Sequence, residues 1–566
     1  MLDRTMPHKT IASSGEGALP GLVQASMLTS DGVRLDADIW MPLGEEDAPV
    51  LLMRQAYGRR LGSALCYAHP AWYARQGFIV VIQDVRGRGT SEGEFTAFVH
   101  EARDGAEAIE WAAALPRSNG RVGLYGFSYQ GTNQLLAAGL RPPALRAMAP
   151  AMIGWDLFAD WASEDGALRL ASNISWGIQM AAGTAEHRGE MAAWEELFAA
   201  SRALPLNAPV NARPPVLERH RALGHYHDWL ERPASDPYWS AVSPSAALAE
   251  LRAGGVPALF VGGWFDTHLP GTLAGFDALG GALMIGPWTH FPWDRSVADR
   301  DFGSAAVSPV DHAQVRWFRR WLMDDANVEL SPPISLFDMG TCEWRTGDIW
   351  PEERTTFHLG GEGIASVDGT SATLGPAPGE TCIEYLVHDP WRPAPSVGGA
   401  FGTPPGPVYR AKVDNRTDVL TFTTAPLEDS LALFGEVGAD LAVACDSPAF
   451  DLACVLSRID ARGRVTQIAE GHRSLLAHRA GDRIAVSLRK TCATLRPGER
   501  LRLSIAAAAY PAYPVNPGTG RRPADAPRSE ARLITIGIIT GGADGSLLHL
   551  SMAQGQTTQQ ENQDYV

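Results

Sequence analysis

Short apolar runs, each followed by a polar or glycine-rich turn, divide the first part of the chain into candidate strands and helices. Such runs stand at Val50–Met53, Phe78–Ile82 and Val122–Tyr125, and later at Ala258–Val261 and Ala282–Ile285. Between the second and third runs, Glu107–Ala114 combines good helix formers with an apolar stripe. Because buried strands that alternate with helices are typical of a parallel sheet, we expect an α/β domain.

The pattern changes twice farther along the chain. Across residues 152–250, Trp, Ala, Glu and Arg recur at helical spacing and continuous β-branched runs are absent, which predicts a helical insertion. From Pro332 to about Leu550, alternating segments such as Asp418–Phe422, Arg483–Leu488 and Leu501–Ile505 are separated by Gly and Pro turns. Many short strands with turns at this spacing favour a sandwich or jelly roll.

Composition and charge narrow the class of protein. A chain of 566 residues is too long for one hydrophobic core, and its 45% hydrophobic and 20% charged residues are typical of globular domains. The formal net charge of −16 disfavours a nucleic-acid partner, because such binding depends on Lys and Arg at phosphates. Since no apolar segment has the length of a membrane span, we expect no membrane partner and a cytoplasmic location. The sequence leaves the oligomeric state open, with a homo-oligomer as one alternative.

The six cysteines do not suggest a metal site. They are scattered along the chain, form no CxxC pair and have no histidine at the spacing of metal ligands. We therefore expect no metal or cofactor, and free thiols rather than disulfides. A Cys445–Cys454 disulfide is left open in case the protein is exported.

The segment Arg121–Gly131, RVGLYGFSYQG, places Ser128 between a strand and a helix-compatible stretch. This is the context of a nucleophile elbow, a sharp turn in which small neighbours let a serine adopt a strained conformation. The spacing here is G-x-S-x-x-G, whereas G-x-S-x-G is commoner. The alternative is an ordinary strand-to-helix turn in which Ser128 caps the helix.

Two further residues follow predicted strands in the order that a Ser–Asp–His triad requires. A serine hydroxyl is a weak nucleophile, so it needs a base, and His290 in GPWTH can take its proton. Asp266 in GGWFD would hold the imidazole tautomer and stabilise the imidazolium. The alternatives are a structural loop histidine and an aspartate that caps a helix. The order and positions favour an α/β-hydrolase domain.

Two other motifs carry less weight. The segment His225–Asp228 (HYHD) looks like a metal cluster, but it has no zinc pair spaced by four residues and is more typical of a solvated helix end. The segment Arg86–Thr90 is glycine-rich and follows a strand, but it does not have the order of a phosphate-binding loop. A turn is the better interpretation.

Several segments in the right order resemble the CocE/NonD hydrolases, the family of cocaine esterase, α-amino acid ester hydrolases and X-Pro dipeptidyl peptidases. The resemblance covers nearly the whole chain and rests on DVRGRGTSEGEF (84–95), NGRVGLYGFSYQG (119–131), GGWFD (262–266), GPWTH (286–290) and DVLTFTTAPL (418–427). It implies an α/β-hydrolase domain with an inserted helical cap, followed by an all-β jelly-roll C-terminal domain. We place the catalytic domain at 1–151 and 251–330, the cap at 152–250, the jelly roll at 331–552 and a disordered tail at 553–566.

The resemblance also implies the remaining site residues. Tyr57 matches the family tyrosine whose phenol donates to the oxyanion, and Tyr129 would donate through its backbone N–H. Trp161 and Trp176 match pocket tryptophans, and we add His268, just after Asp266, to the substrate pocket. The alternatives are a core aromatic for Tyr57 and packing within the cap for the two tryptophans.

We therefore predict that the protein is a serine carboxylesterase. It would cleave esters with small neutral acyl groups, aromatic ones included, through an acyl-enzyme. An amidase or acylase on the same scaffold is the alternative, because both reactions share the acyl-enzyme. The residues after Asp266, Thr267 to Leu269, do not include the acidic side chains that α-amino acid ester hydrolases use for a substrate ammonium. Four cap carboxylates, Asp156, Asp160, Glu164 and Asp165, are the alternatives for that role. A binding or scaffolding protein would require a broken triad, and none is visible.

Overall fold

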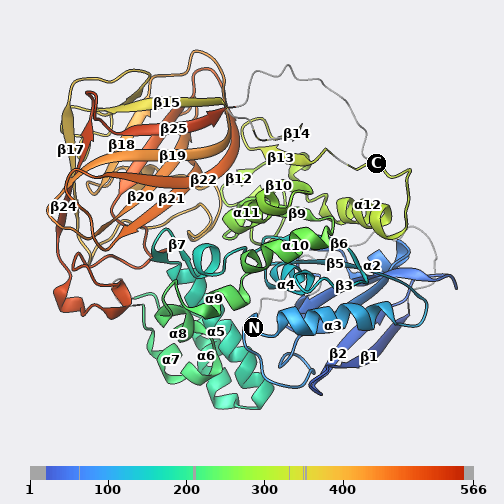
Figure 1. The fold of residues 1–566 in the computed structure, drawn as a ribbon. Coiled ribbons are helices and arrows are strands. Elements are labelled where there is room, and N and C mark those ends of the chain that lie inside the picture. Colours follow the sequence, from blue (N-terminus) through green and yellow to red (C-terminus); the bar gives the residue numbers. More distant parts are fainter. Residues whose placement is uncertain are drawn as a thin grey trace.

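The computed structural model describes residues 21–62, 64–207, 212–330, 332–347, 350 and 353–552. Figure 1 shows an α/β part in blue to green beside an all-β part in yellow to red, with a group of helices in teal and green below them. The predicted tail at 553–566 lies outside the described residues. The arrangement is that of an α/β-hydrolase-like domain followed by an all-β domain.

The first sheet is mostly parallel. Its strand order is β1-β2-β4-β3-β5-β6-β9-β10-β13-β14, and the pairs from β4 to β13 are parallel while both edges are antiparallel. The strands are β1 (Leu22–Leu28), β2 (Arg34–Trp40), β3 (Ala48–Gln55), β4 (Ile79–Asp84), β5 (Ser118–Phe127), β6 (Leu145–Ala151), β9 (Leu259–Phe265), β10 (Ala282–Thr289), β13 (Ile334–Asp338) and β14 (Glu343–Gly347). All five apolar runs that we predicted as strands therefore overlap strands of this sheet, and two of them begin one residue before the strand.

Helices cover both faces of this sheet, which explains why its strands are continuously apolar. Along β3, Val50 and Leu52 pack with residues of α3 and α4, whereas Leu51 and Met53 pack with residues of α12. Successive side chains of a strand point to opposite faces, so the two helix groups lie on opposite sides. The helices are α1 (Arg59–Gly62), α2 (Pro70–Arg75), α3 (Glu101–Ala113), α4 (Tyr129–Ala138), α10 (Leu248–Gly254), α11 (Leu269–Leu279) and α12 (Val310–Leu322).

The insertion between β6 and β9 is mainly helical. Its helices are α5 (Leu170–Arg188), α6 (Met191–Arg202), α7 (Pro215–Arg219), α8 (Tyr226–Glu231) and α9 (Pro237–Val242). It also contains a small hairpin that the helical pattern did not predict, β7 (Ser163–Glu164) and β8 (Ala167–Leu168). Asp165 and Gly166 at its tip both have positive φ, 44° and 84°. An Asp-Gly pair adopts this conformation readily, and it closes tight hairpins.

The C-terminal part is an all-β domain. Its strand order is β17-β24-β19-β25-β15-β16-β18-β23-β20-β21, with β22 paired to β19. The strands are β15 (Glu353–Gly360), β16 (Thr373–Gly375), β17 (Cys382–His388), β18 (Val419–Thr424), β19 (Leu431–Cys445), β20 (Phe450–Ile459), β21 (Val465–Leu475), β22 (Arg483–Leu495), β23 (Arg500–Ala506), β24 (Ile534–Thr540) and β25 (Leu547–Met552). The three example strands predicted from alternation coincide with β18, β22 and β23.

The first sheet continues past residue 330, where we placed the start of the β domain. Strand β13 pairs in parallel with β10, and all five of its residues are buried. Strand β14 then pairs with β13 and ends the sheet. After Pro332 and Pro333 the chain thus returns to the first sheet, where β13 and β14 cover the edge of β10.

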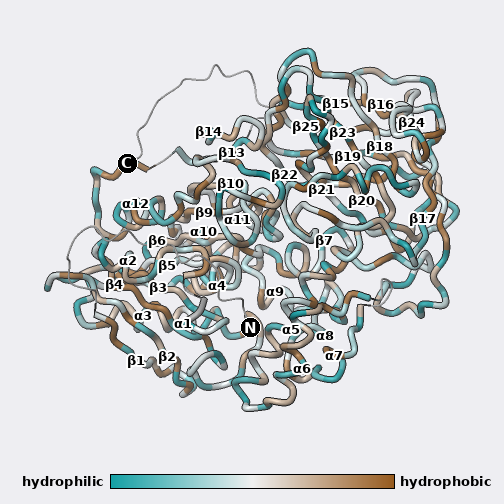
Figure 2. The backbone as a smooth tube through the Cα atoms, turned by 180° about the vertical axis from the view of Figure 1, so that it is seen from behind, coloured by the Kyte–Doolittle hydropathy of each residue, from teal (hydrophilic) through white to brown (hydrophobic). Residues whose placement is uncertain are grey.

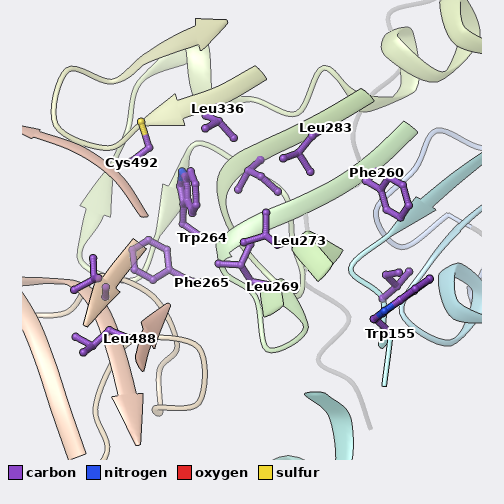
Figure 3. Close-up of a cluster of buried hydrophobic side chains, with 14 of the residues drawn as sticks. Trp155, Phe260, Trp264, Phe265, Leu269, Leu273, Leu283, Leu336, Leu488 and Cys492 are labelled. Atoms are coloured by element: carbon purple, nitrogen blue, oxygen red, sulfur yellow. The ribbon is translucent and has the colours of Figure 1, made fainter. Parts of the chain in front are cut away.

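The two sheets share one hydrophobic cluster beside the carboxyl end of β9. Phe265 and Leu269 from the α/β part pack in the same cluster as Leu488 and Cys492 from β22. Figure 3 shows Phe265 and Leu488 close to each other in this view, with Trp264 between Phe265 and Cys492 and with Leu336 above them. Figure 2 shows hydrophobic stretches along the central strands β3, β4 and β5. The shared cluster lies next to the predicted triad aspartate, so both parts of the molecule fix its position.

Two predictions from the sequence, about membrane spans and about disulfides, can be compared with the described residues. No described helix is both long enough and apolar enough to cross a membrane. All six cysteines lie in the described ranges and are free, so Cys445 and Cys454 do not form the disulfide that was left open.

Candidate active site

Ser128 lies at the turn between β5 and α4 in a strained backbone conformation. Its φ is 61° and its ψ is −124°, which is rare for a residue with a side chain. The turn is held by hydrogen bonds from Ser128 N to Ala151 O (2.9 Å) and from Gly131 N to Ser128 O (3.0 Å). Strain at this position is the mark of a nucleophile elbow, because it directs the hydroxyl away from the sheet.

The unusual G-x-S-x-x-G spacing has a steric explanation. A side chain at Gly126, which has a φ of 142°, would place its Cβ 2.6 Å from Gln130 Cβ. A side chain at Gly131 would place its Cβ 2.5 Å from Ala151 O. Gln130 occupies the position that is more often glycine, and its amide donates to Gln55 Oε1 at 2.6 Å. The turn therefore needs glycine at 126 and 131, and a longer side chain fits at 130.

Two hydrogen-bonding contacts connect the three predicted triad residues in the order Ser128, His290 and Asp266. His290 Nε2 is 3.0 Å from Ser128 Oγ, and His290 Nδ1 is 2.7 Å from Asp266 Oδ1. Asp266 is fully buried, and its other oxygen accepts from the backbone N–H of His268 at 3.1 Å. Asp266 follows β9 and His290 follows β10, and these strands are parallel neighbours. Their carboxyl ends bring the two side chains together, which favours proton transfer from the serine to the imidazole.

Tyr57, which follows β3, lies beside the serine. Its phenol oxygen accepts a hydrogen bond from Trp176 Nε1 at 3.1 Å and forms another with Ser128. Burial raises the pKa of Tyr57 above its ordinary value. The phenol therefore stays protonated at working pH and is available as a neutral donor.

Of Tyr129, only the backbone N–H is available beside Ser128, because its side chain is engaged elsewhere. Its phenol donates to Glu101 Oε1 at 3.0 Å, accepts from Phe98 N at 3.1 Å, and its ring stacks on Phe98 with centroids 4.3 Å apart. As the first residue of α4, Tyr129 has an N–H with no acceptor inside the helix. The side chain anchors the helix, and the amide next to Ser128 is left for a ligand oxygen.

The predicted pocket residues complete a ring of contacts that begins and ends at Ser128. His268 lies 5.2 Å from His290 and 4.1 Å from Trp161, measured between ring centroids. Trp161 lies 5.2 Å from Trp176, which donates to Tyr57. Trp161 is buried in an aromatic cluster that also contains Trp229 and Trp239, so it packs in the cap as well. Burial and the neighbouring His290 lower the pKa of His268 far below its ordinary value, so its ring is neutral.

Each of the four cap carboxylates named as alternatives for binding an ammonium group has at least one partner elsewhere. Their partners are the backbone N–H groups of Phe158 and Ala159 for Asp156, those of Trp155 and Asp156 for Asp160, the guanidinium groups of Arg169 and Arg489 for Glu164, and Arg473 for Asp165. None of these contacts involves the ring of residues around Ser128. The other three carboxylates are held by partners outside that ring, whereas Asp160 keeps one buried oxygen, Oδ1, without a hydrogen-bond partner among the described residues.

The segment His225–Asp228 differs from our expectation. It begins α8 as predicted, but the side chains of His225 and His227 are buried and not solvated. His225 packs against Trp176 and Trp229, with ring centroids 4.2 and 4.7 Å apart. Hydrophobic periodicity could not reveal this, because part of the burying surface, Trp176, comes from α5. Within the described ranges, no group of three or more ligating side chains is arranged to hold a metal ion.

Sequence reasoning also missed Arg489, which β22 of the C-terminal domain places against the triad aspartate. Its guanidinium donates to the backbone oxygens of Asp266 (2.9 Å) and Thr267 (3.3 Å), and it pairs with Glu164 of the cap at 3.0 Å. No local motif marks this residue. The segment Arg86–Thr90 is a turn as predicted, but Arg88 within it points into the protein and is buried.

Comparison with known proteins identifies the family. Residues 31–292 match the family model described as X-Pro dipeptidyl-peptidase (S15 family), and residues 326–549 match the X-Pro dipeptidyl-peptidase C-terminal non-catalytic domain. Cocaine esterase from a Rhodococcus species is 30% identical over 525 residues, which cover 87% of this chain and 91% of the esterase.

Two solved structures share the fold over almost the whole chain at 20% identity. An aminopeptidase from a marine sediment archaeon of the Thaumarchaeota superposes with a TM-score of 0.79 and covers 97% of this chain and 99% of its own. An α-amino acid ester hydrolase superposes with a TM-score of 0.77 and covers 97% of this chain and 100% of its own. Together with the match to cocaine esterase, the two family domains establish that this chain is a serine carboxylic ester hydrolase and belongs to the CocE/NonD family.

Proposed function

We propose that the protein hydrolyses small neutral esters, aromatic acyl groups included, through an acyl-enzyme on Ser128. The observation that carries this proposal is the pair of hydrogen bonds at His290, 3.0 Å to Ser128 Oγ and 2.7 Å to Asp266 Oδ1. One nitrogen is positioned to take the serine proton, and the other is held by a buried carboxylate that stabilises the resulting imidazolium.

The reaction proceeds in two halves. Ser128 Oγ attacks the ester carbonyl while His290 takes the hydroxyl proton, and the C–O bond to the leaving alcohol then breaks as His290 returns that proton to the alcohol. Water next attacks the acyl-enzyme, with His290 as the base, and the carboxylic acid leaves as Ser128 is regenerated.

The tetrahedral intermediates need stabilisation of a negatively charged oxygen. The Tyr57 phenol and the Tyr129 backbone N–H are the donors for this role. Donors fixed before the reaction act most strongly on charge that develops only in the transition state. Releasing its hydrogen bond to Ser128 frees the phenol for the substrate oxygen.

The acyl group is proposed to lie among Trp161, Trp176 and His268. Aromatic rings favour an aromatic or small apolar acyl group through offset and edge contacts. Burying an ammonium there would cost on the order of several kcal/mol without a carboxylate partner. Three of the four cap carboxylates, Asp156, Glu164 and Asp165, are held by other groups, which supports acyl groups that carry no positive charge, and Asp160 keeps one unpaired oxygen, Oδ1.

The test compares Ser128→Ala with Ser175→Ala, a control at an exposed position on α5. With phenyl acetate, we expect Ser128→Ala to lose on the order of 10³-fold or more in kcat and Ser175→Ala to keep wild-type kcat. A fluorophosphonate should label the wild type and the control at residue 128, as mapped by peptide mass spectrometry. Turnover by Ser128→Ala, or labelling at another serine, would overturn the proposal. A matched anilide measures the amidase alternative on the same variants.

A further inference from the structure

A small cavity lies between the hydrolase domain and the C-terminal domain. Its volume is about 10 Å³. Its wall contains residues from both domains: Phe265, Arg300 and Met339 from the first, and Arg458, Thr466 and Ile468 from the second. Phe265 is the residue before the triad aspartate, and Figure 3 shows it close to Leu488 of the C-terminal domain. Each domain therefore contributes one arginine to the same cavity.

Arg300, the first residue of β12 (Arg300–Asp301), carries a charge that no carboxylate neutralises. The residue is partly buried, and its guanidinium lies 4.5 Å from the centre of the Phe302 ring. Its Nη2 donates weakly to Cys342 Sγ at 3.7 Å. Among the residues that the structure describes, no Asp or Glu forms an ion pair with Arg300. Because a guanidinium has five N–H donors, most of them stay free for a ligand.

Arg458, on β20, also has a donor without an acceptor. Its Nε is buried and has no hydrogen-bond partner in the described part of the chain. Glu499 pairs with it only at a distance, because Oε1 lies 3.8 Å from that Nε, beyond the length of a hydrogen bond. The other oxygen of Glu499 accepts from Arg496 N at 3.0 Å. Glu499 therefore balances charge without occupying the donors of Arg458.

The charges around the cavity are unbalanced. Two guanidinium groups line it, and within the described ranges Glu499 is the one carboxylate that pairs with either. By contrast, Arg345 at the end of the first sheet has Asp338 as a partner at 2.7 Å. Burial, and then the charge of Arg458, lower the pKa of Arg300, but a guanidinium stays protonated at working pH. An anion between the two groups would remove this repulsion.

We propose that Arg300 and Arg458 bind one small inorganic anion of halide size, chloride, in this cavity, and that the bound anion holds the two domains together beside Phe265. Guanidinium N–H groups carry positive charge and are weakly hydrated, so they suit an anion in a partly buried site. A cavity of about 10 Å³ has room for about one water-sized particle, which makes sulfate, phosphate and organic carboxylates too large. The site is separate from Ser128, and the inference does not depend on the proposed function.

Bromide locates the anion directly. Crystals of the full-length wild type are soaked in sodium bromide, and anomalous diffraction is measured at the bromine absorption edge. We expect an anomalous peak in the cavity between the guanidinium groups of Arg300 and Arg458. A water molecule at that position, or no density, would overturn the site.

Thermal unfolding measures the effect of the anion on stability. In sodium chloride we expect the wild-type Tm to lie roughly 2 °C or more above its value in sodium gluconate of equal ionic strength, because the anion binds the native state and gluconate is too large for the cavity. Arg458→Met should lose this difference. Arg354→Met, at an exposed arginine of β15 that pairs with Glu436, is the matched control and should keep it. Equal Tm values for the wild type in the two salts would contradict the proposal.

Arg300→Gln separates anion binding from a structural role of the side chain. The change removes the repulsion between the two arginines, so the variant should melt at or above the wild-type Tm in gluconate. In chloride it should melt below the wild type, because it has lost the anion. If Arg300 only packs against Phe302, the variant would lose the same Tm in both salts, and the anion site would be wrong.

Ser128→Ala distinguishes this inference from the proposed function. We expect that variant to keep the full difference in Tm between chloride and gluconate while it loses turnover of phenyl acetate. Retained turnover would count against the role of Ser128 and leave the anion site unaffected. A chloride effect that disappears in Ser128→Ala would place the anion at the catalytic serine and overturn its assignment to Arg300 and Arg458.

Discussion

Tyr57 serves two neighbours with one hydroxyl group. It accepts from Trp176 Nε1 and hydrogen-bonds to Ser128, and burial keeps it protonated by raising its pKa. A donor that acts on the oxyanion contributes to the transition state and little to the bound ester. The phenol oxygen therefore affects the rate of the chemical steps more than substrate binding.

The change Tyr57→Phe tests this role. We expect kcat for phenyl acetate to fall by roughly 10² to 10³ with little change in KM, measured by steady-state kinetics. Tyr73→Phe is the control, because that buried phenol donates to Asp311 at 2.7 Å away from the triad and should affect stability without affecting kcat. An unchanged kcat in Tyr57→Phe would remove the phenol from the oxyanion site.

At the scale of single residues, the sequence identified the groups that follow strands and missed those fixed by distant packing. Ser128, Asp266 and His290 each come directly after an apolar run, so the pattern of strands located them. Arg88 and His225 are 137 positions apart in the sequence. Both contact α5, whose residues come between them in the chain. No local pattern shows that a buried guanidinium has been left without a carboxylate.

At the scale of elements, the turn from β5 into α4 controls both the serine and the Tyr129 amide. Gly131 lies where this helix crosses β6, and a Cβ there would come 2.5 Å from Ala151 O and 2.7 Å from Ile153 Cγ2. The carbonyl of Ala151 cannot move easily, because its oxygen also accepts a hydrogen bond from Ser128 N at 2.9 Å. The register of the helix is thus coupled to the geometry of the oxyanion donors.

The substitution Gly131→Ala should therefore reduce both stability and activity. We expect the free energy of unfolding to fall by roughly 1 to 3 kcal/mol in urea titrations, and kcat to fall as α4 shifts. Gly254→Ala in α10 is the matched control, because its new Cβ would find its nearest neighbour, Arg141 Cγ, at an ordinary 3.5 Å. Wild-type stability and kcat in Gly131→Ala would show that the turn tolerates a side chain.

Element prediction succeeded where burial is continuous and failed where strands are very short. The strands β3, β4, β5, β9 and β10 are buried on both faces, so unbroken apolar runs marked them. The two-residue strands β7 and β8 have no periodicity to detect. Strand β13 lies within the residues that match the C-terminal family model, yet it pairs with β10 of the first sheet.

At the scale of the whole molecule, one guanidinium joins the three parts. Arg489 of β22 binds the backbone of Asp266 and Thr267 in the hydrolase domain and the carboxylate of Glu164 in the cap. Despite the opposing effect of burial, Arg489 and Arg169 lower the pKa of Glu164 to about 2, so this junction stays charged at working pH. The cytoplasmic location stays a prediction from the sequence.

We expect Arg489→Met to act on catalysis by displacing Asp266. Small displacements at a triad reduce the rate steeply, so kcat should fall roughly tenfold to a hundredfold while KM changes little. Arg489→Lys should recover part of kcat, because it restores a donor and a charge. Arg483→Met, on the same strand but paired with Asp440 at the surface, is the control. A loss of thermal stability without any loss of kcat would assign Arg489 a purely structural role.

The hydrophobic cluster that Phe265 and Leu269 share with Leu488 has a consequence for engineering. The C-terminal segment matches a domain described as non-catalytic, but it covers the apolar surface directly beside the triad aspartate. Truncation to a minimal hydrolase would expose that surface to water and free the loop that follows β9. A chimera that exchanges C-terminal domains between relatives therefore has to exchange these contact residues with them, because the cluster that joins the two domains also packs directly beside Asp266.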